Sequence, residues 1–314
     1  MSYNLVEKKL KANGVVILDG GNGGELESSG AKMDKDLWAG KCAIDDPDKM
    51  LQVHEKYINA GADIITSNTY AITPISMKEY GYDQFTKAWN EESVKLALKA
   101  ANHSKREIAV AGSVSTSGSW DKLSEEDIKP GFNEHLKILK EAGVDLIILE
   151  AMTSKDRTVE NIIECSKNVK LPIWLSISCA INEDENILMH GYQESITNSK
   201  AKFYDTLENS LSKFSKMHDG PILVAHSDIK VTGEAVKILK KVHKGIVGAY
   251  PNNGYFEKPH WKLINDISPS KYLEEAKNWI SNGAQIIGGC CGVGPDKISA
   301  VSYTHLTLPT TSTV

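Results

Sequence analysis

One pattern occurs three times in this sequence and constrains its fold more than any other feature. In each copy a helix-like segment ends at a glycine, and a short apolar run follows; the glycines are Gly61, Gly143 and Gly283. Glycine often ends a helix in the left-handed conformation, and a short apolar run after it is typical of a buried strand. The residues at the same distance after Gly61, Gly143 and Gly283 are Asn68, Glu150 and Cys290, respectively. The pattern therefore predicts helix–strand units whose strands end at one level.

Similar apolar runs alternate with amphipathic helical segments along the chain. Eight runs are short enough to be buried strands, and they lie near residues 15–18, 62–68, 108–114, 144–150, 173–180, 222–226, 246–250 and 284–290. Strands that alternate with helices form a parallel sheet, and eight such units predict an α/β protein with a single-domain (β/α)8 TIM barrel. A doubly wound open sheet is the alternative. In a barrel, functional residues lie at the C-terminal ends of the strands.

The end of the chain departs from this pattern. A last helix is expected to begin at Pro295, but residues 301–314 lack helical periodicity and are rich in threonine, which favours an irregular tail. We expect the barrel to occupy residues 1–300. We interpret residues 301–314 as different from the natural end of the protein, because the closing helix of the barrel would be cut short.

Composition excludes several classes of protein. The chain has 314 residues, of which 41% are hydrophobic, and a net charge of -5 without a basic cluster, which argues against a nucleic-acid partner. No apolar run has the length of a membrane span, and the N-terminus lacks the apolar stretch of a secretion signal. Five cysteines, two of them adjacent, do not resemble a disulfide framework. A cytoplasmic location is expected.

The last predicted strand runs into Gly288-Gly289-Cys290-Cys291-Gly292. Neighbouring side chains on a regular strand point to opposite faces, so the two thiols can converge only where glycines let the backbone leave that geometry. Paired thiolates favour a zinc site. Inert buried cysteines and a disulfide between neighbours are the alternatives.

A zinc site needs at least one more ligand. His226 ends the sixth predicted strand at the level of the cysteine pair, and imidazole is a common zinc ligand. Asp228 is the second choice. Of the other cysteines, Cys42 is expected in a polar loop, and Cys165 and Cys179 are expected to be structural.

Two carboxylates are expected at the same mouth of the barrel. Asp19 ends the first strand and Glu150 the fourth, and a buried Glu150 would need a cationic partner. Asp19 has helix capping as an alternative role. The glycine-rich segment 19–25 lacks the dinucleotide-binding spacing, but its amides can hold a carboxylate. An ammonium and a carboxylate together indicate an α-amino acid.

Five motifs of this sequence resemble the homocysteine S-methyltransferase family, in order from about residue 12 to 300. They are Leu18–Leu26, Ser67–Tyr70, Leu149–Met152, Tyr250–Asn252 and Gly288–Gly292. The resemblance implies a TIM barrel with Zn²⁺ that binds the thiolate of homocysteine. It also implies that Cys290 and Cys291 are zinc ligands and that Asp19 and Glu150 receive the amino-acid end; the substrate-binding set is Asp19, Gly20, Asn68 and Glu150.

The sequence departs from the family at the third zinc ligand. The family has a cysteine after the sixth strand, whereas this chain has Ala225-His226-Ser227-Asp228. Aligning the next helix by its apolar positions places His226 where the family has that cysteine, only slightly better than Ser227. The predicted metal ligands are thus His226, Cys290 and Cys291.

The expected reaction is methyl transfer from a small sulfonium or quaternary ammonium donor to homocysteine, which gives methionine. Such a donor can rest on aromatic rings, for which Tyr70, Trp120 and Tyr250 are candidates, although all three can equally serve in packing. S-methylmethionine, S-adenosylmethionine, betaine and dimethylsulfoniopropionate are all compatible donors. A non-catalytic barrel that binds an amino acid and a zinc-dependent barrel hydrolase are the alternative functions.

Overall fold

The computed structural model describes residues 2–118, 122–153, 156–191, 193–197, 202–257, 260–263 and 266–307. Eight parallel strands form one sheet, in the order β1-β12-β9-β8-β5-β4-β3-β2. Their bounds are β1 Val16–Ile17, β2 Ile64–Thr66, β3 Ala109–Val114, β4 Leu146–Met152, β5 Ile173–Ile177, β8 Ile222–Asp228, β9 Val247–Asn252 and β12 Ala284–Ile287. Each lies in or overlaps one of the predicted apolar runs, so the predicted strands are confirmed.

The sheet closes on itself between its two end strands. Leu18, just beyond β1, forms a parallel bridge with Ile64 of β2. Two backbone hydrogen bonds flank this bridge: Asp63 N donates to Ile17 O over 2.7 Å, and Asp19 N donates to Ile64 O over 3.0 Å. The sheet is therefore a barrel, and the doubly wound alternative is wrong.

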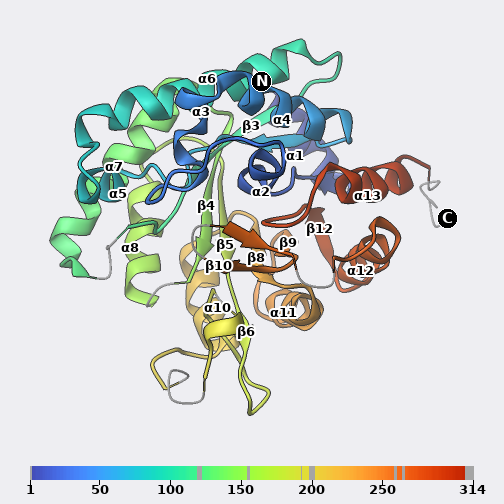
Figure 1. Ribbon diagram of the computed structural model, residues 1–314. Coiled ribbons are helices and arrows are strands. Elements are labelled where there is room, and N and C mark those ends of the chain that lie inside the picture. The colour runs from blue at the N-terminus through green and yellow to red at the C-terminus, as the bar shows by residue number, and fades with distance from the viewer. Residues whose placement is uncertain are drawn as a thin grey trace.

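Helices surround the barrel in chain order, and α13 packs beside α4 to close the ring (Figure 1). The helices are α1 Tyr3–Lys11, α2 Asn22–Ser28, α3 Cys42–Asp45, α4 Pro47–Asn59, α5 Pro74–Glu79, α6 Thr86–His103, α7 Glu125–Ala142, α8 Asp156–Ser166, α10 Leu207–Met217, α11 Ile229–Val242, α12 Pro269–Ser281 and α13 Pro295–Thr307. Short 3-10 turns are η1 Ala39–Lys41, η2 Asp83–Phe85 and η4 Gln193–Ser195. Two small antiparallel ribbons, which the sequence did not predict, are β6 Ala180–Ile181 with β7 Ile187–Leu188 and β10 Tyr255–Glu257 with β11 His260–Lys262.

The three glycines of the repeated pattern have the predicted left-handed backbone, with φ of 102° at Gly61, 97° at Gly143 and 103° at Gly283. L-residues with a Cβ rarely adopt this conformation. At Gly61 a Cβ would also clash with the side chain of Ser302 in α13. These glycines therefore let the chain leave α4, α7 and α12 and enter the next strand.

Alternate residues of each strand pack on opposite sides of the sheet. In β4, Leu146 and Ile148 join a cluster inside the barrel, whereas Ile147 and Leu149 join the larger core between sheet and helices. Helix α1 contributes Val6 and Leu10 to the inside cluster. The N-terminal end of the barrel is thereby closed, which leaves the C-terminal end for a site.

Helix α13 differs from the prediction at its end. It continues past Ala300 to Thr307, because Val301 and Ser302 are buried and Ser302 packs on Gly61. The expectation of an irregular tail is therefore wrong for residues 301–307, and residues 308–314 lie outside the described residues.

One further local prediction is wrong. Cys42 is the first residue of α3 and is buried, rather than lying in a polar loop. Helix α10 begins at Leu207, with Thr206 as its N-cap, and Phe203 before it is 79% exposed. Over the described residues, no helix combines the length and apolar character needed to cross a membrane.

Candidate active site and metal centre

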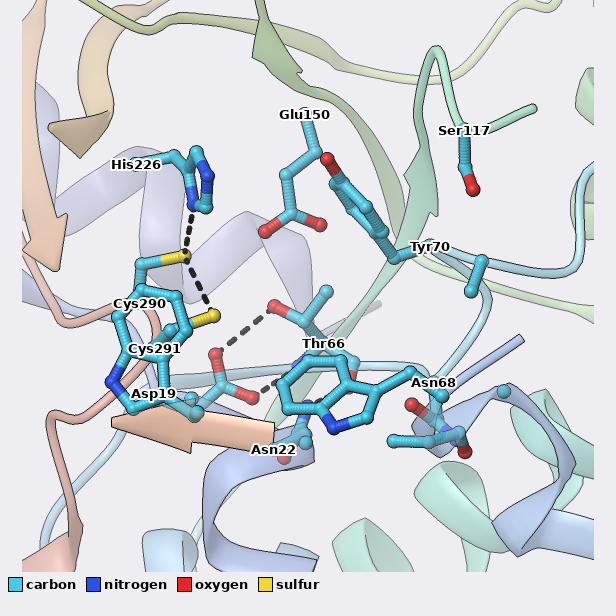
Figure 2. Close-up of a pocket in the computed structure, with 18 of the residues that line it drawn as sticks. Asp19, Asn22, Thr66, Asn68, Tyr70, Ser117, Glu150, His226, Cys290 and Cys291 are labelled. Atoms are coloured by element: carbon cyan, nitrogen blue, oxygen red, sulfur yellow. Dashed lines mark hydrogen bonds between the residues drawn. The ribbon is translucent and has the colours of Figure 1, made fainter. Parts of the chain in front are cut away.

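A cavity of about 250 Å³ opens at the C-terminal end of the barrel strands. All the predicted substrate and metal residues line it: Asp19, Gly20, Asn68, Glu150, His226, Cys290 and Cys291. Figure 2 shows the two cysteines and His226 on one side of the cavity and Glu150 near Tyr70 on another. The strand ends therefore bring the predicted residues together, while their individual roles stay predictions.

The two adjacent thiols and the imidazole of His226 form one group. Cys290 Sγ lies 4.0 Å from Cys291 Sγ and 3.7 Å from His226 Nδ1. Among the described residues, one potential ligand atom from each of these three lies within 4.8 Å of the others. In a tetrahedral zinc site with bonds of about 2.0–2.3 Å, ligand atoms lie roughly 3.5–3.8 Å apart, so this group is close to that geometry.

Glycines allow the two cysteines to converge. Strand β12 ends at Ile287, and the backbone then turns, with Val293 N donating to Cys290 O over 3.1 Å. A Cβ at Gly289 would clash with Val293, and one at Gly292, where φ is 76°, would clash with Asn253 O. The glycines that flank the pair are thus required by close packing as well as by the turn.

His226 lies where β8 becomes irregular. The register of β8 against β9 shifts between Ala225 and Asp228, and His226 has a φ of 45°. Asn252 of β9 fixes the ring, with its Nδ2 lying 3.0 Å from His226 Nδ1. Asp228, the second choice as a ligand, instead caps α11 by accepting a hydrogen bond from Lys230 N over 2.8 Å.

The charges of this group depend on one another. The hydrogen bond with Cys291, together with burial, raises the pKa of the Cys290 thiol well above its usual value. Burial acts to lower the pKa of His226, but the interaction with Cys290 and the negative charges of Glu150 and Glu194 together raise that pKa. A divalent cation would favour the deprotonated thiols and the neutral imidazole, so the donor set fits a soft metal such as zinc.

Asp19 is held by Thr66 of β2. Its Oδ2 accepts a hydrogen bond from Thr66 N over 2.6 Å, and its Oδ1 accepts one from Thr66 Oγ1 over 3.0 Å. Burial, opposed by these hydrogen bonds and reinforced by the charge of Glu150, raises the pKa of Asp19 to about 8. Asn22 completes the arrangement, because its Nδ2 donates to Thr66 O over 2.9 Å.

Glu150 lies across the cavity in β4, where Ser113 Oγ donates to its Oε2. Burial raises the pKa of Glu150, although the hydrogen bond from Ser113 opposes this effect. Asp19 is buried and Glu150 is half-buried, and two such carboxyl groups in one cavity favour a cationic ligand, because a positive charge stabilises their ionised forms.

Gly20 and Asn68 line the cavity in different ways. A Cβ at Gly20 would clash with Val293 O and lie 2.8 Å from the ring of Tyr57, so the chain needs glycine here. Asn68 Nδ2 donates to Ala39 O over 2.7 Å and so holds η1 at the edge of the cavity.

Aromatic side chains also line the cavity. Of the predicted candidates, Tyr70 and Tyr250 line it, and Trp120 lies outside the described residues. Three more aromatic residues, which the sequence did not single out, are Trp38, Phe256 and Trp261. The only available signal was their position in segments that follow the first and seventh strands, where a barrel places its functional loops.

Comparison with known proteins identifies the family. The sequence model of the homocysteine S-methyltransferase family matches residues 16–304. The chain belongs to this family. Homocysteine S-methyltransferase 3 of Zea mays is 29% identical, covering 93% of this chain and 90% of the maize protein. Selenocysteine methyltransferase of Astragalus bisulcatus is 25% identical, over 93% of this chain and 92% of that protein.

A solved structure shows the same fold. The metallated form of the homocysteine methyltransferase MmuM from Escherichia coli has a TM-score of 0.73 and 22% identity, covering 92% of this chain and 96% of that one. The resemblance found in the sequence is confirmed, and this member of the homocysteine S-methyltransferase family is a homocysteine methyltransferase enzyme. Family membership favours methyl transfer over the hydrolase and the non-catalytic barrel.

Proposed function

We propose that this enzyme is a zinc-dependent methyltransferase that moves a methyl group from a small sulfonium or quaternary ammonium donor to the thiol of homocysteine and so produces methionine. The observation that carries the proposal is a single cavity that contains both the Cys290–Cys291–His226 group and the carboxyl groups of Asp19 and Glu150. Metal ligands and an ammonium-binding pair thus lie within one small space.

The amino-acid end of homocysteine is assigned to the carboxyl groups. Loss of solvation raises the pKa values of Asp19 and Glu150, and a substrate ammonium would stabilise their charged forms. The amides of the glycine-rich turn at Gly20–Gly24 are proposed to receive the substrate carboxylate. This orientation directs the thiol of homocysteine toward Cys290, Cys291 and His226.

Zn²⁺ held by Cys290, Cys291 and His226 would supply the positive charge that keeps the homocysteine thiol deprotonated. The thiolate sulfur then forms a bond to the donor methyl carbon while the bond from that carbon to the donor heteroatom breaks. The bonding electrons leave with the heteroatom. The sulfur of a sulfonium donor, or the nitrogen of a quaternary ammonium donor, therefore becomes neutral as it departs and needs no general acid. The remaining task of the protein is to hold the two reactants close and aligned.

The donor is assigned to the aromatic side of the cavity. Trp38, Tyr70 and Phe256 line it, and aromatic faces attract a positively charged onium group by about 0.5–2 kcal/mol. All five cysteines are free thiols, which supports the proposal of a reducing, cytoplasmic location.

Zinc content and methionine formation test the proposal together. The purified protein should contain about one zinc per chain, and it should form methionine from homocysteine with at least one of S-methylmethionine, S-adenosylmethionine, betaine and dimethylsulfoniopropionate. Cys290→Ala and Cys291→Ala should lose both zinc and activity. Cys165→Ala is the control, because Cys165 lies in α8 away from the cavity. Full zinc content and activity in either cavity variant would contradict the proposed site.

A further inference from the structure

The β10–β11 ribbon has one face on the cavity. Phe256 of β10 lies directly opposite Trp261 of β11 in the antiparallel pair. Residues directly opposite each other share a face of the ribbon, and both of these side chains line the cavity. Residues of the other face, such as Glu257 and His260, are exposed. The ribbon is therefore amphipathic, and its aromatic face covers part of the site.

Trp261 packs on the loop that carries the cysteines. Its Nε1 donates to Asn253 O over 2.8 Å, and a Cβ on Gly292 would lie only 2.7 Å from that nitrogen. Asn253 N in turn donates to Cys291 O over 2.8 Å. The Trp261 and His226 ring centroids are 6.4 Å apart. Trp261 thus lies beside the proposed metal ligands and contacts the loop that positions Cys290 and Cys291.

A single carboxylate holds this part of the ribbon in place. Glu27, in α2, pairs through Oε1 with His260 Nδ1 and through Oε2 accepts a hydrogen bond from Trp261 N over 3.2 Å. The side chain of Glu27 is 22% exposed, and Glu27 does not itself line the cavity. Its contacts therefore fix two consecutive residues of β11 without involving the proposed substrate contacts.

The other strand of the ribbon has an aromatic contact. The ring of Phe256 meets that of Trp38 edge to face, with centroids 5.8 Å apart and an interplanar angle of 68°. Trp38 in turn packs on Gly23, where a Cβ would lie 3.1 Å or less from the indole ring. Both strands are thus fixed to the segment that follows β1.

We infer that Glu27 is a positioning residue that holds the β10–β11 ribbon as a clasp over the metal centre, with Trp261 limiting the access of small molecules to Cys290 and Cys291. The inference rests on the metal site of the proposed function. Loss of the Glu27 carboxylate removes two contacts to β11, and contacts of this kind are individually modest. The expected result is more frequent opening of the clasp rather than loss of the fold.

Alkylation of the metal-free protein tests the clasp without any need for zinc. Iodoacetamide labelling of Cys290 and Cys291, followed by mass spectrometry, should be about tenfold faster in Glu27→Ala and Trp261→Ala than in the parent. Glu257→Gln is the matched control, because it removes a carboxylate from the outer face of the same ribbon. Labelling of buried Cys179, which does not line the cavity, reports global opening and should stay unchanged.

Zinc release gives a second measurement on the loaded protein. Transfer of Zn²⁺ to a chromogenic chelator should be about tenfold faster in Glu27→Ala than in the parent or in Glu257→Gln. Parental labelling rates in both Glu27→Ala and Trp261→Ala would overturn the clasp. A parent protein that binds no zinc would instead overturn the proposed function. The labelling rates would still test whether Glu27 and Trp261 limit access to the cysteines, because that experiment uses the metal-free protein. If an alanine variant does not fold, Glu27→Gln and Trp261→Phe provide milder tests of the same contacts.

Discussion

Cys290 Sγ lies 3.7 Å from Nδ1 of His226, although the two residues are 64 positions apart in the chain. Cys290 follows β12, and His226 belongs to β8. These two strands are separated in the sheet by β9. Asn252 of β9 contacts the same imidazole nitrogen, so three strands contribute to this arrangement. We therefore propose this imidazole as the third metal ligand next to the cysteine pair.

Replacing His226 should weaken zinc binding. We expect His226→Ala to reduce zinc affinity by more than about tenfold. Replacing residues that merely hydrogen-bond to a metal ligand already lowers metal affinity by about 10–100-fold, and loss of a ligand should cost more. His226→Cys should restore tight binding, since a thiolate is also a zinc ligand. Competition with a chelator of known affinity measures both effects.

Asp228→Asn is the control for the His226 variants. Asp228 caps α11 and is not part of the three-residue ligand group found among the described residues. Its zinc affinity should match that of the parent. Unchanged zinc affinity in His226→Ala would show that the third ligand lies elsewhere.

The barrel could be predicted because its signals are local. Each repeated unit has a capping glycine and a short apolar run, and both depend on residues that are close in sequence. Once parallel strands are inferred, their C-terminal ends must meet at one edge. That requirement alone brings Asp19, Glu150, His226 and Cys290 together.

The β10–β11 ribbon could not be predicted in the same way. Its strands have three residues each, too few for a periodic pattern, and Trp261 is held by Glu27 from 234 positions away. The extension of α13 has a similar cause, since burial of Ser302 depends on a glycine in a distant part of the chain. Tertiary contacts of this kind leave no local signal in the sequence.

Helix α1 should contribute to stability without contributing to the site. Leu10 is 3% exposed and packs inside the barrel at the end opposite the cavity. We expect Leu10→Ala to lower the free energy of unfolding by about 2–5 kcal/mol, as other buried leucines do. Denaturant unfolding measures this loss, and zinc content per folded chain should stay unchanged.

Leu5→Ala is the matched control for Leu10→Ala. Leu5 belongs to the same helix but is 47% exposed, so its replacement should change stability by no more than about 0.5 kcal/mol. Equal losses in the two variants would mean that α1 is stabilised by something other than the packing of Leu10 inside the barrel.

Glu150 should affect the affinity for homocysteine more than the metal. If its carboxylate receives the substrate ammonium, Glu150→Gln removes a charge-assisted hydrogen bond, and KM for homocysteine should rise roughly 10–100-fold. Zinc content should match that of the parent. Glu164→Gln, on the exposed Glu164–Lys129 ion pair, is the control. An unchanged KM with lowered stability would assign Glu150 a structural role only.

Asp19 should make the stability of the ligand-free protein depend on pH. Its pKa is raised from 3.8 to about 8, and burial is the largest cause. Between these values the folded protein holds a proton on Asp19 that the unfolded chain releases. The stabilising contribution of this proton is therefore complete below about pH 4 and is lost as the pH rises toward 8, at up to about 1.4 kcal/mol per pH unit.

Asp19→Asn isolates this effect, because asparagine has a similar shape but no proton to lose. Denaturant unfolding at several pH values between about 4 and 8 should show a shallower fall of stability with rising pH in Asp19→Asn than in the parent. Asp45→Asn, which alters a carboxylate whose side chain is 40% exposed, should keep the parental slope. Homocysteine should oppose the fall in the parent, since its ammonium favours the ionised carboxylate. Identical slopes in Asp19→Asn and the parent would mean that Asp19 is ionised in the folded protein and already has a stabilising partner before substrate binds.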